Sequence, residues 1–454
     1  MKNILFVCFI LMTTYPIVSQ NYYMTQPEGY GVATTGGGSV TPVTVTTYAD
    51  LKAKIKLTTP QVILVSGTIT FSASELQISE VVTNKTIIGL PGAKLVNLNQ
   101  TAAGSGILNL KAGSSNVIIR NLIFEGPGAW DIDGRDNLGV EGCVNLWVDH
   151  CEFQDGLDGN FDIKNNSDNI TVSWCKFTYL KPPTTTGYVS GGTPDHRFSN
   201  LIGSSSTNFP NTDGRFSVTY QNCYWADGVK ARMPRARNSE LHILNCYYKA
   251  IIPGSDPETT ITSSAALGLG AGPNGTTCFV DNSHFDKVAN IYSPVNEGTG
   301  SISLAFDNCL GAIPSNVGTI IPPTYNYTKL DVNDVATYIP DNNCGAGATL
   351  QVTSSGEMSS CGGNLSLAEK AIKIGVTYYP TIVDDILHID FSNQLNGIVT
   401  IKIYAIGGQN VFNYSNDITS SKKLELDLTS LAKGLYLCNL QIKDHAINWK
   451  IIKK

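Results

Sequence analysis

The sequence lacks any apolar run long enough to cross a membrane, and it carries little charge and no excess of basic residues. A membrane-spanning helix needs about 20 apolar residues, whereas the longest early run covers only residues 4–12. Charged residues make up 15% of the chain and the formal net charge is −6. These shortages exclude a membrane span and a broadly basic surface of the kind that binds nucleic acids.

The beginning of the chain predicts export. Met1-Lys2-Asn3 precede the apolar residues 4–12, and small or polar residues follow at Ser19-Gln20. This layout is typical of a signal peptide, which we place at residues 1–20. We therefore expect a secreted protein, either released or attached to the cell surface.

Disulfide bonds are not expected to build the fold, although the chain has 11 cysteines. A chain of 454 residues can form one large domain and a smaller one without such cross-links. Several cysteines also recur at one place in a repeated phrase, which predicts buried thiols. They are Cys151, Cys175, Cys223, Cys246 and Cys309.

The repeated phrase consists of a β-rich run, a polar residue, a small residue, any residue and usually an aromatic one. It occurs as Asn121-Leu-Ile-Phe124, His150-Cys-Glu-Phe153, Trp174-Cys-Lys-Phe177, Asn222-Cys-Tyr-Trp225, Asn245-Cys-Tyr-Tyr248, Asn282-Ser-His-Phe285 and Asn308-Cys-Leu-Gly311. A helical hydrophobic period is absent from this region. Each copy is too short to bury its apolar face alone, so the copies must stack as a solenoid.

We expect an all-β fold, a right-handed parallel β-helix over residues 21–344. In such a stack the recurring Asn side chains would bond to one another along one bend, and the Cys side chains would form an internal file. A leucine-rich repeat is excluded because its spacing of Leu and Asn is missing.

The composition changes after about residue 341. The Gly, Ser and Thr-rich residues 345–372 predict a linker. Cys361 within it and Cys344 just before it could form a disulfide. Short strands separated by turns follow in residues 373–454 and predict a small antiparallel β-sandwich.

This C-terminal part resembles the sorting domain of proteins exported by the type IX secretion system. The matching pieces are Tyr379-Pro380, Asp385-Ile-Leu-His-Ile389, Ile406-Gly-Gly408, Leu428-Thr-Ser-Leu-Ala-Lys-Gly-Leu-Tyr436 and Lys450-Ile-Ile-Lys-Lys454. Thr381-Ile382 replace the Asn-Pro pair that usually follows Tyr-Pro. The resemblance implies the type IX machinery as a partner; a carbohydrate-binding sandwich is the alternative.

Three acidic residues are candidates for a metal site: Asp136, Asp158 and Asp162. The last two stand four positions apart in the Gly-containing turn of residues 155–162. Calcium takes about six to eight oxygen ligands, which clustered carboxylates and carbonyls in a turn can provide. A solvated turn without a metal is the alternative.

Several motifs, by their order and spacing, resemble the pectate lyases of polysaccharide lyase family 1. They are Gly29-Tyr-Gly-Val32, Gly67-Thr-Ile69, Lys85-Thr-Ile-Ile-Gly89, Trp147-Val-Asp-His150, Asp162-Ile-Lys164, Thr171-Val-Ser-Trp174 and Arg232-Met-Pro-Arg-Ala-Arg237. The resemblance covers residues 29–248, about half of the chain. It implies a pectate lyase that cleaves α-1,4-linked polygalacturonate by β-elimination and yields 4,5-unsaturated oligogalacturonides.

The resemblance also assigns roles to individual residues. It implies that Asp136, Asp158 and Asp162 ligate Ca²⁺ and that Arg232 is the catalytic base. From residue type alone, Arg232 would instead be assigned to carboxylate binding, as would its neighbours in the same motif.

Two further residues match substrate-binding positions of the family, Lys181 and Arg237. Lys181 precedes an insertion, residues 182–200, in which Asp195-His-Arg197 are expected to brace the loop; contact with the site is the alternative. Elimination removes the C5 proton beside a carboxylate whose charge opposes carbanion formation. Calcium, Lys181 and Arg237 would together neutralise that charge.

One departure from the family pattern keeps other functions open. Arg135 stands where many relatives have glycine before the first ligand, and in the related pectin lyases an arginine replaces calcium. The alternatives are therefore a metal-independent pectin lyase acting on methyl-esterified pectin, and a non-catalytic adhesin that binds acidic polysaccharide.

Asp149-His150, which lie in a predicted strand, are not expected to form a catalytic triad. We expect a monomer.

Overall fold

The computed structural model describes two compact units, Met1–Cys361 and Gly362–Lys454. The described residues are 22–252, 264–320, 322–359, 376–392, 395–405, 409–442 and 445–454. The predicted signal peptide, Cys361 and the Ile406-Gly-Gly408 motif lie outside them. Within the described ranges, no helix has the length and apolar character needed to cross a membrane.

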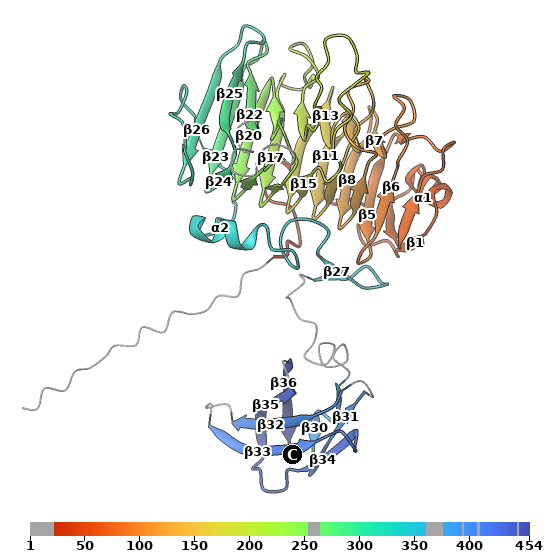
Figure 1. Cartoon of the computed structure of the whole chain (residues 1–454), viewed down its shortest axis with the longest axis vertical. Helices are drawn as coiled ribbons and strands as arrows, with labels where there is room; N and C mark the ends of the chain where they lie inside the picture. The colour runs from red at the N-terminus through yellow and green to blue at the C-terminus, as the bar shows by residue number, and fades with distance from the viewer. Residues whose placement is uncertain are drawn as a thin grey trace, which may run out of the picture. The chain divides into compact units, whose positions relative to one another are not determined.

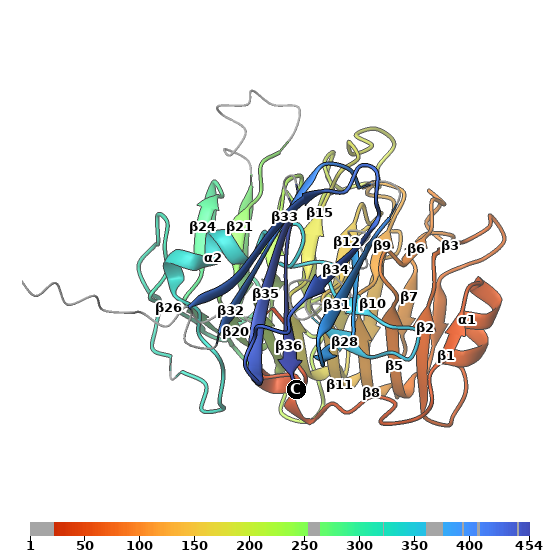
Figure 2. The ribbon, with the colours of Figure 1, turned by 90° about the horizontal axis from the view of Figure 1, so that it is seen from below.

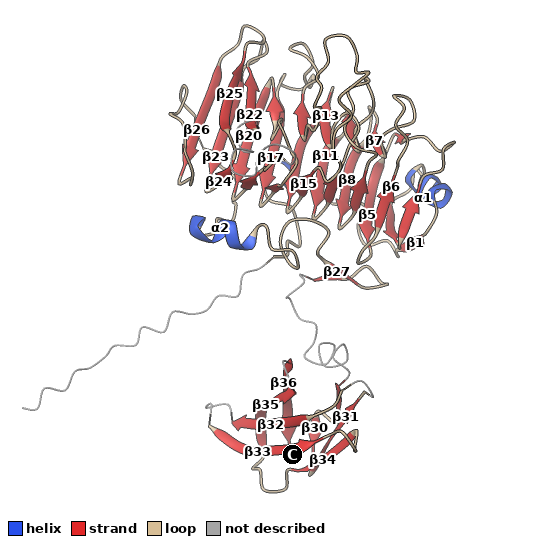
Figure 3. Cartoon of the chain, viewed as in Figure 1, coloured by secondary structure: helices blue, strands red, loops and turns tan. Residues whose placement is uncertain are grey.

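Three parallel sheets, called here A, B and C, build the first unit (Figures 1 and 3). Sheet A has ten strands: β1 (Val43–Val45), β2 (Gln61–Val65), β5 (Thr83–Gly89), β8 (Ser115–Arg120), β11 (Val144–Asp149), β14 (Asp168–Ser173), β17 (Phe216–Gln221), β20 (Ser239–Leu244), β23 (Thr276–Asp281) and β26 (Ile302–Asp307).

Sheets B and C have eight strands each. Sheet B contains β3 (Thr68–Thr70), β6 (Lys94–Val96), β9 (Ile123–Glu125), β12 (Glu152–Gln154), β15 (Lys176–Thr178), β18 (Tyr224–Trp225), β21 (Tyr247–Lys249) and β24 (His284–Lys287). Sheet C contains β4 (Ile78–Glu80), β7 (Leu108–Leu110), β10 (Leu138–Glu141), β13 (Phe161–Lys164), β16 (Asn200–Ile202), β19 (Arg235–Ala236), β22 (Ala265–Gly270) and β25 (Asn290–Val295).

The chain visits the sheets in the repeating order A, B, C, so that each coil stacks on the one before. Strand β11, for example, pairs in parallel with β8 on one side and β14 on the other. In Figure 1 the strands of this unit run side by side from β1 to β26. This arrangement is a parallel β-helix and confirms the predicted fold class.

The bend from sheet A to sheet B explains the recurring asparagine. The bend residue takes a left-handed conformation, with φ of 56° at Asn222 and 52° at both Asn245 and Asn282. Asparagine tolerates this conformation better than most residues. Its amide also donates along the stack, from Asn245 to Asn222 at 2.9 Å and from Asn282 to Asn245 at 2.8 Å. The predicted asparagine ladder is confirmed.

Aromatic rings and thiols fill the interior as parallel files. The Phe177, Trp225 and Tyr248 rings stack with centroids 5.5 and 4.6 Å apart. Four of the five predicted buried thiols are buried and free, and Cys309 is half-buried. Cys309 is the exception because it follows β26, the last strand of sheet A, over which no further coil stacks. Cys344 is disulfide-bonded, and its predicted partner Cys361 lies outside the described residues.

Two short helices add to the otherwise β structure. Helix α1 (Tyr48–Ile55) is capped by Thr47, whose side chain accepts from the Asp50 amide, and it buries Leu51 and Ile55 in the core. It lies beside β1 and β2 at one end of the stack (Figure 2). Helix α2 (Val332–Tyr338) packs Val335 in a cluster with Trp174 of the β-helix. The 3₁₀ helix η1 (Gly29–Ala33) contacts strands β11, β14 and β17 of sheet A.

Part of the predicted linker is packed against sheet A. Residues 351–359 form a hairpin of β27 (Gln351–Val352) and β28 (Met358–Ser359). Leu350 joins an apolar cluster with Leu64 and Ile88, and its amide donates to Asn121 Oδ1 at 2.8 Å. These apolar contacts, which a composition-based prediction could not see, hold the first part of the segment on the β-helix.

The second unit is a small β-sandwich. One sheet joins β29 (Val376–Tyr379), β31 (Ile386–Phe391) and β34 (Lys423–Asp427), and the other joins β30 (Ile382–Val383), β36 (His445–Lys453), β35 (Gly434–Ile442), β32 (Ile398–Ala405) and β33 (Asn410–Asp417). Neighbouring strands are antiparallel except β30 and β36. Apolar residues of both sheets, such as Leu387 and Ile401, share one core. The predicted sandwich is confirmed.

Candidate active site

The candidate residues lie in successive coils, in strand β13 of sheet C and in the loops that lead from sheet B to sheet C. Asp136 and Asp158 lie in the loops before β10 and β13, and Asp162 is part of β13. Arg232 lies in the loop before β19. Because equivalent loops of stacked coils emerge side by side, residues far apart in the sequence meet at this edge of the β-helix.

Asp136 and Asp162 form the centre of the site. Both are almost fully buried, with exposed fractions of 5% and 1%. The Lys164 ammonium lies 3.1 Å from Asp136 Oδ2 and 3.3 Å from Asp162 Oδ2. Asp162 Oδ1 also accepts from the Leu201 amide at 3.0 Å. The two carboxylates are therefore close enough to share one cation.

Gly159 leaves space between these two carboxylates. A Cβ atom at Gly159 would lie 2.8 Å from Asp136 Oδ1 and 3.3 Å from Asp162 Oδ1. Asp136 Oδ1 is buried and has no hydrogen-bond partner among the residues that the structure describes. A buried carboxylate oxygen without a partner is costly, and a bound cation satisfies it. The cluster thus fits an oxygen-liganded metal such as calcium.

Burial and mutual repulsion disturb the titration of this cluster. Burial, together with the negative charge of Asp162, raises the pKa of Asp136 to about 8. Burial likewise raises the pKa of Asp162, although the charges of Lys164 and Arg232 oppose that rise. The proximity of both carboxylates raises the pKa of Lys164, so its ammonium stays charged. More negative charge is gathered here than Lys164 alone balances.

Asp158 is held differently, by a residue of the insertion. Its Oδ1 lies 3.2 Å from His196 Nε2, so the imidazole contacts this carboxylate. Burial opposes ionisation, but His196 and the charge of Arg232 keep the pKa of Asp158 below its ordinary value. Asp158 therefore presents an ionised carboxylate beside the buried pair.

Arg232 approaches the same carboxylates from the loop before β19. Its φ of 62° is left-handed, an unusual conformation for a residue other than glycine and one that concentrates at functional sites. Its guanidinium carbon lies 4.3 Å from the centre of the Phe198 ring. Its charge acts on Asp158 and Asp162, so the structure brings the predicted base together with the predicted metal ligands.

The two predicted substrate-binding residues have other partners. Lys181 Nζ donates to Gly126 O at 2.7 Å and pairs with Glu125 at 3.2 Å. Arg237 is buried and pairs with Glu297, and it also donates to the Gly203 carbonyl oxygen. Neither residue makes a contact with the three aspartates in the part of the chain that the structure describes.

Two family models match the sequence. The model described as pectate lyase covers residues 4–317, and the model described as secretion system C-terminal sorting domain covers residues 377–454. The chain belongs to the pectate lyase family. Its sorting domain indicates export to the cell surface or beyond, which confirms the predicted location.

Known relatives agree with this membership. Pectate lyase plyB of Emericella nidulans is 32% identical over 333 residues, 70% of this chain and 86% of that protein. A pectate trisaccharide-lyase of Thermotoga maritima is 36% identical over 229 residues, 49% of this chain, and the match spans only 53% of that relative's length. A Bacillus pectate lyase solved in complex with trigalacturonate shares the fold, with a TM-score of 0.51 and 20% identity over 68% of this chain and 96% of that one.

Arg135, the departure from the family pattern, stays outside the acidic cluster. Its side chain is exposed, and its backbone amide donates to Ser105 Oγ at 2.9 Å. No ion pair joins it to the three aspartates among the described residues. Arg135, the residue that raised the pectin lyase alternative, therefore does not take the place of a metal ion among these carboxylates.

Sequence reasoning missed Lys164 as part of the site, and for His196 it favoured bracing of the loop over the contact with the site that the structure has. Lys164 had been noticed only as the end of a motif, although its position two residues after Asp162 puts both side chains on one face of a strand. His196 lies in the insertion, outside the motifs on which the predicted family resemblance depends. The expected bracing is present as well, because Arg197 forms two hydrogen bonds of 2.8 Å with Asp195.

Proposed function

We propose that this chain is a calcium-dependent pectate lyase that cleaves polygalacturonate by β-elimination. The observation that carries the proposal is the buried oxygen of Asp136, which faces the space left by Gly159 and has Asp162 on the other side. A catalytically silent binding module has no need for a buried carboxylate oxygen without a hydrogen-bond partner in an acidic cluster that also faces an arginine. Family membership supplies the reaction class.

Asp136, Asp158 and Asp162 would hold the calcium. When bound, calcium supplies positive charge that stabilises the negative charge developing on the uronate as its C5 proton leaves. The carboxylates would fix this charge in a partly buried site, where water screens it less than in solution. Lys164, held between Asp136 and Asp162, would keep them apart and limit their repulsion.

The neutral form of the Arg232 guanidine would take the proton from C5 of the uronate. The bond from C4 to the glycosidic oxygen then breaks, the leaving oxygen takes a proton from water, and a 4,5 double bond remains. Phe198 contacts its guanidinium and Asp158 and Asp162 face it, so its position is constrained on several sides. A positioned base typically contributes about 10² to 10⁴ in rate. The assignment as base rests on the family motif that begins at this residue.

Lys181 and Arg237 are proposed to bind substrate carboxylates. For Arg237 this requires an exchange, because its guanidinium pairs with Glu297. Glu297 is shared with Arg235, at 2.6 Å, and keeps about a quarter of its side chain exposed, 27%. A uronate carboxylate could therefore replace Glu297 as the bidentate partner of Arg237.

The test is a lyase assay on purified protein with polygalacturonate, in calcium and in chelator, with ultraviolet absorbance of the unsaturated product as the readout. We expect absorbance to rise in calcium and to stop with chelator. Activity that survives the chelator and prefers methyl-esterified pectin would select the metal-independent pectin lyase. Absence of product from every uronate polymer, with binding retained, would select the adhesin.

We also propose that the type IX secretion machinery recognises the second unit. Support comes from the sorting-domain match and from its compact sandwich, whose core is separate from that of the β-helix. The partner of this unit would then be the export apparatus, while the β-helix meets the polysaccharide.

A further inference from the structure

We infer that His196, a residue of the insertion, positions Asp158 for calcium and so sets the calcium affinity of the site. The inference rests on the proposed function, since it takes Asp158 as a calcium ligand. It assigns a role to a residue that the family motifs do not include.

His196 is fixed at both ends of its ring. Nδ1 lies 3.1 Å from Asp131 Oδ2 and 3.2 Å from Thr193 Oγ1, and Nε2 lies 3.2 Å from Asp158 Oδ1. The Asp131 carboxylate is itself held by the Thr193 amide, which donates to Oδ2 at 2.6 Å. With an exposed fraction of 6%, the imidazole is buried between the carboxylates of Asp131 and Asp158.

The surrounding loop holds the imidazole of His196 in place. The Phe198 ring packs against the imidazole at a tilt of 54°, with ring centroids 4.3 Å apart. Its backbone oxygen accepts from the Tyr179 hydroxyl at 2.7 Å. The Ser199 oxygen accepts from the Phe161 amide at 3.0 Å, which ties the end of the insertion to β13. The ring therefore cannot swing away from Asp158 without disturbing several contacts.

Asp158 depends on His196 for its orientation. Its side chain is 24% exposed, far more than those of Asp136 and Asp162, and among the described residues His196 is the one basic side chain within 4.0 Å of its carboxylate. A carboxylate that ligates a metal is usually oriented by a partner on its other oxygen. Here Oδ1 contacts the imidazole, so Oδ2 would be the oxygen available to a calcium ion. Loss of such a partner typically lowers metal affinity about 10-fold to 100-fold.

The experiment is calorimetric titration of calcium into the metal-free full-length protein, without substrate. We expect His196→Ala to weaken calcium binding about tenfold or more and His196→Gln, which keeps an N–H donor, to recover part of the loss. At saturating calcium, His196→Ala should regain a turnover number close to that of the wild type. Tyr188→Ala, at an exposed position of the same loop, is the matched control and should bind calcium normally.

Asp131→Asn provides an independent measurement. Asp131 lies 3.1 Å from His196 Nδ1, and one of its carboxylate oxygens lies within 4.8 Å of an Asp158 oxygen. Only the part of its effect on calcium affinity that disappears in His196→Ala therefore passes through the imidazole. We expect Asp131→Asn to weaken binding in the wild type and to have no further effect in His196→Ala, as a double-mutant cycle reveals. Two independent, additive losses would instead indicate general damage to the loop and overturn the inference.

Other outcomes also decide the question. Unchanged calcium affinity in His196→Ala overturns the inference, and so does a loss of turnover that saturating calcium does not restore, because His196 would then act on the substrate. If the wild type binds calcium but cleaves no uronate, the proposed function fails while the titrations still support the role of His196. If the wild type binds no calcium, both fail.

Discussion

Asp136 couples calcium binding to pH, because burial and the neighbouring Asp162 raise its pKa to about 8. The folded, calcium-free protein keeps this carboxyl protonated at neutral pH, whereas an unfolded chain would ionise it near pH 4. The fold therefore loses stability as the pH rises from about 4 to about 8, and calcium, which needs the ionised form, must displace the proton. We predict that calcium affinity rises up to about pH 8 and then levels off.

This prediction can be checked by calcium titration between pH 6 and pH 9 in two buffers of different ionisation enthalpy, which counts the protons released. Asp136→Asn should bind calcium weakly and release no proton. The same proton release in that variant would assign the effect to another group.

Arg232 is the residue for which charge and chemistry can be separated. Arg232→Lys keeps a positive charge near Asp158 and Asp162 but loses the extended guanidinium and its contact with the Phe198 ring. We predict that turnover falls by about 10² or more, while KM and thermal stability change little. Steady-state kinetics with a melting curve measure both effects. Turnover near that of the wild type would remove Arg232 from the role of base.

At the level of single residues, sequence motifs predicted which site residues meet where a regular strand fixes the position of the side chain. Asp162 stands in a regular strand and Asp136 precedes another, so their convergence followed from the stacking of coils. His196 could not be found in this way, because an insertion has no register with its neighbours. The partner of Arg237 was also hidden, since Glu297 comes from a coil 60 residues later in the chain.

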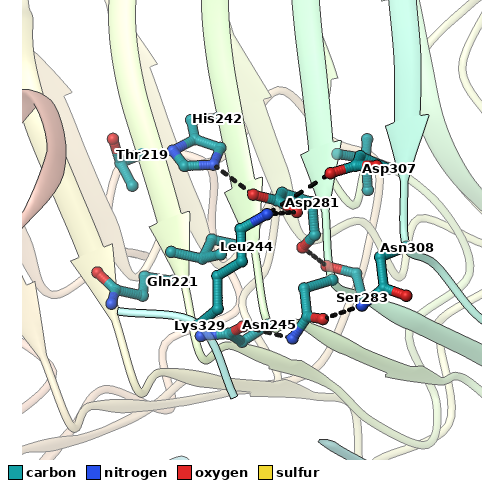
Figure 4. A network of polar contacts seen from close by, with 12 residues as sticks. Thr219, Gln221, His242, Leu244, Asn245, Asp281, Ser283, Asp307, Asn308 and Lys329 are labelled. Carbon is teal, nitrogen blue, oxygen red and sulfur yellow. Dashed lines mark hydrogen bonds and ion pairs between the residues drawn. The ribbon is translucent and has the colours of Figure 1, made fainter. Parts of the chain in front are cut away.

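Among the elements, the segment that crosses sheet A after β26 gives a second pH effect. Figure 4 shows His242 on β20 and Lys329 of this segment converging on Asp281. His242 Nδ1 lies 2.7 Å from the Tyr325 hydroxyl, and Lys329 Nζ lies 2.8 Å from Asp281 Oδ1. Burial, and then the charge of Lys329, lower the pKa of His242 to about 3.

A histidine whose pKa falls on folding stabilises the protein above its unfolded pKa, near 6.5, and this stability is lost as the pH falls toward about 3. We predict that the free energy of unfolding decreases by about 1.4 kcal/mol per pH unit below pH 6.5, in addition to other titrations. Urea unfolding at several pH values should show a smaller slope for His242→Gln. His284→Gln, at a half-buried position of β24, is the matched control. Equal slopes in all three proteins would contradict the role of His242.

The elements themselves were predictable to different degrees. The bends of the β-helix were predictable because a left-handed backbone conformation favours asparagine and because the bend recurs along the stack of coils. Helices α1 and α2, of eight and seven residues, were missed because two turns of helix show too little periodicity. The hairpin of β27 and β28 was missed because its Gly and Ser content resembles that of a free linker.

In the whole molecule, two units with separate cores predict that catalysis and export are separable. Each unit buries its own apolar cluster, and the division falls at Cys361 and Gly362. A chain that ends at Cys361 should therefore fold and keep the lyase activity of the full-length protein within about twofold, the spread expected when no contact of the site is lost. In the natural host, however, it should stay inside the cell.

Cell fractionation, combined with intact-mass measurement of the exported protein, tests this separation. We predict that the full-length chain reaches the surface or the medium and that its exported form ends well before Lys454, because a sorting domain is needed only during transit. Full-length Arg232→Lys is the control, since it should be exported normally while lacking turnover. Export of the truncated chain, or an exported form that retains Lys454, would show that the second unit has another role, such as binding the polysaccharide.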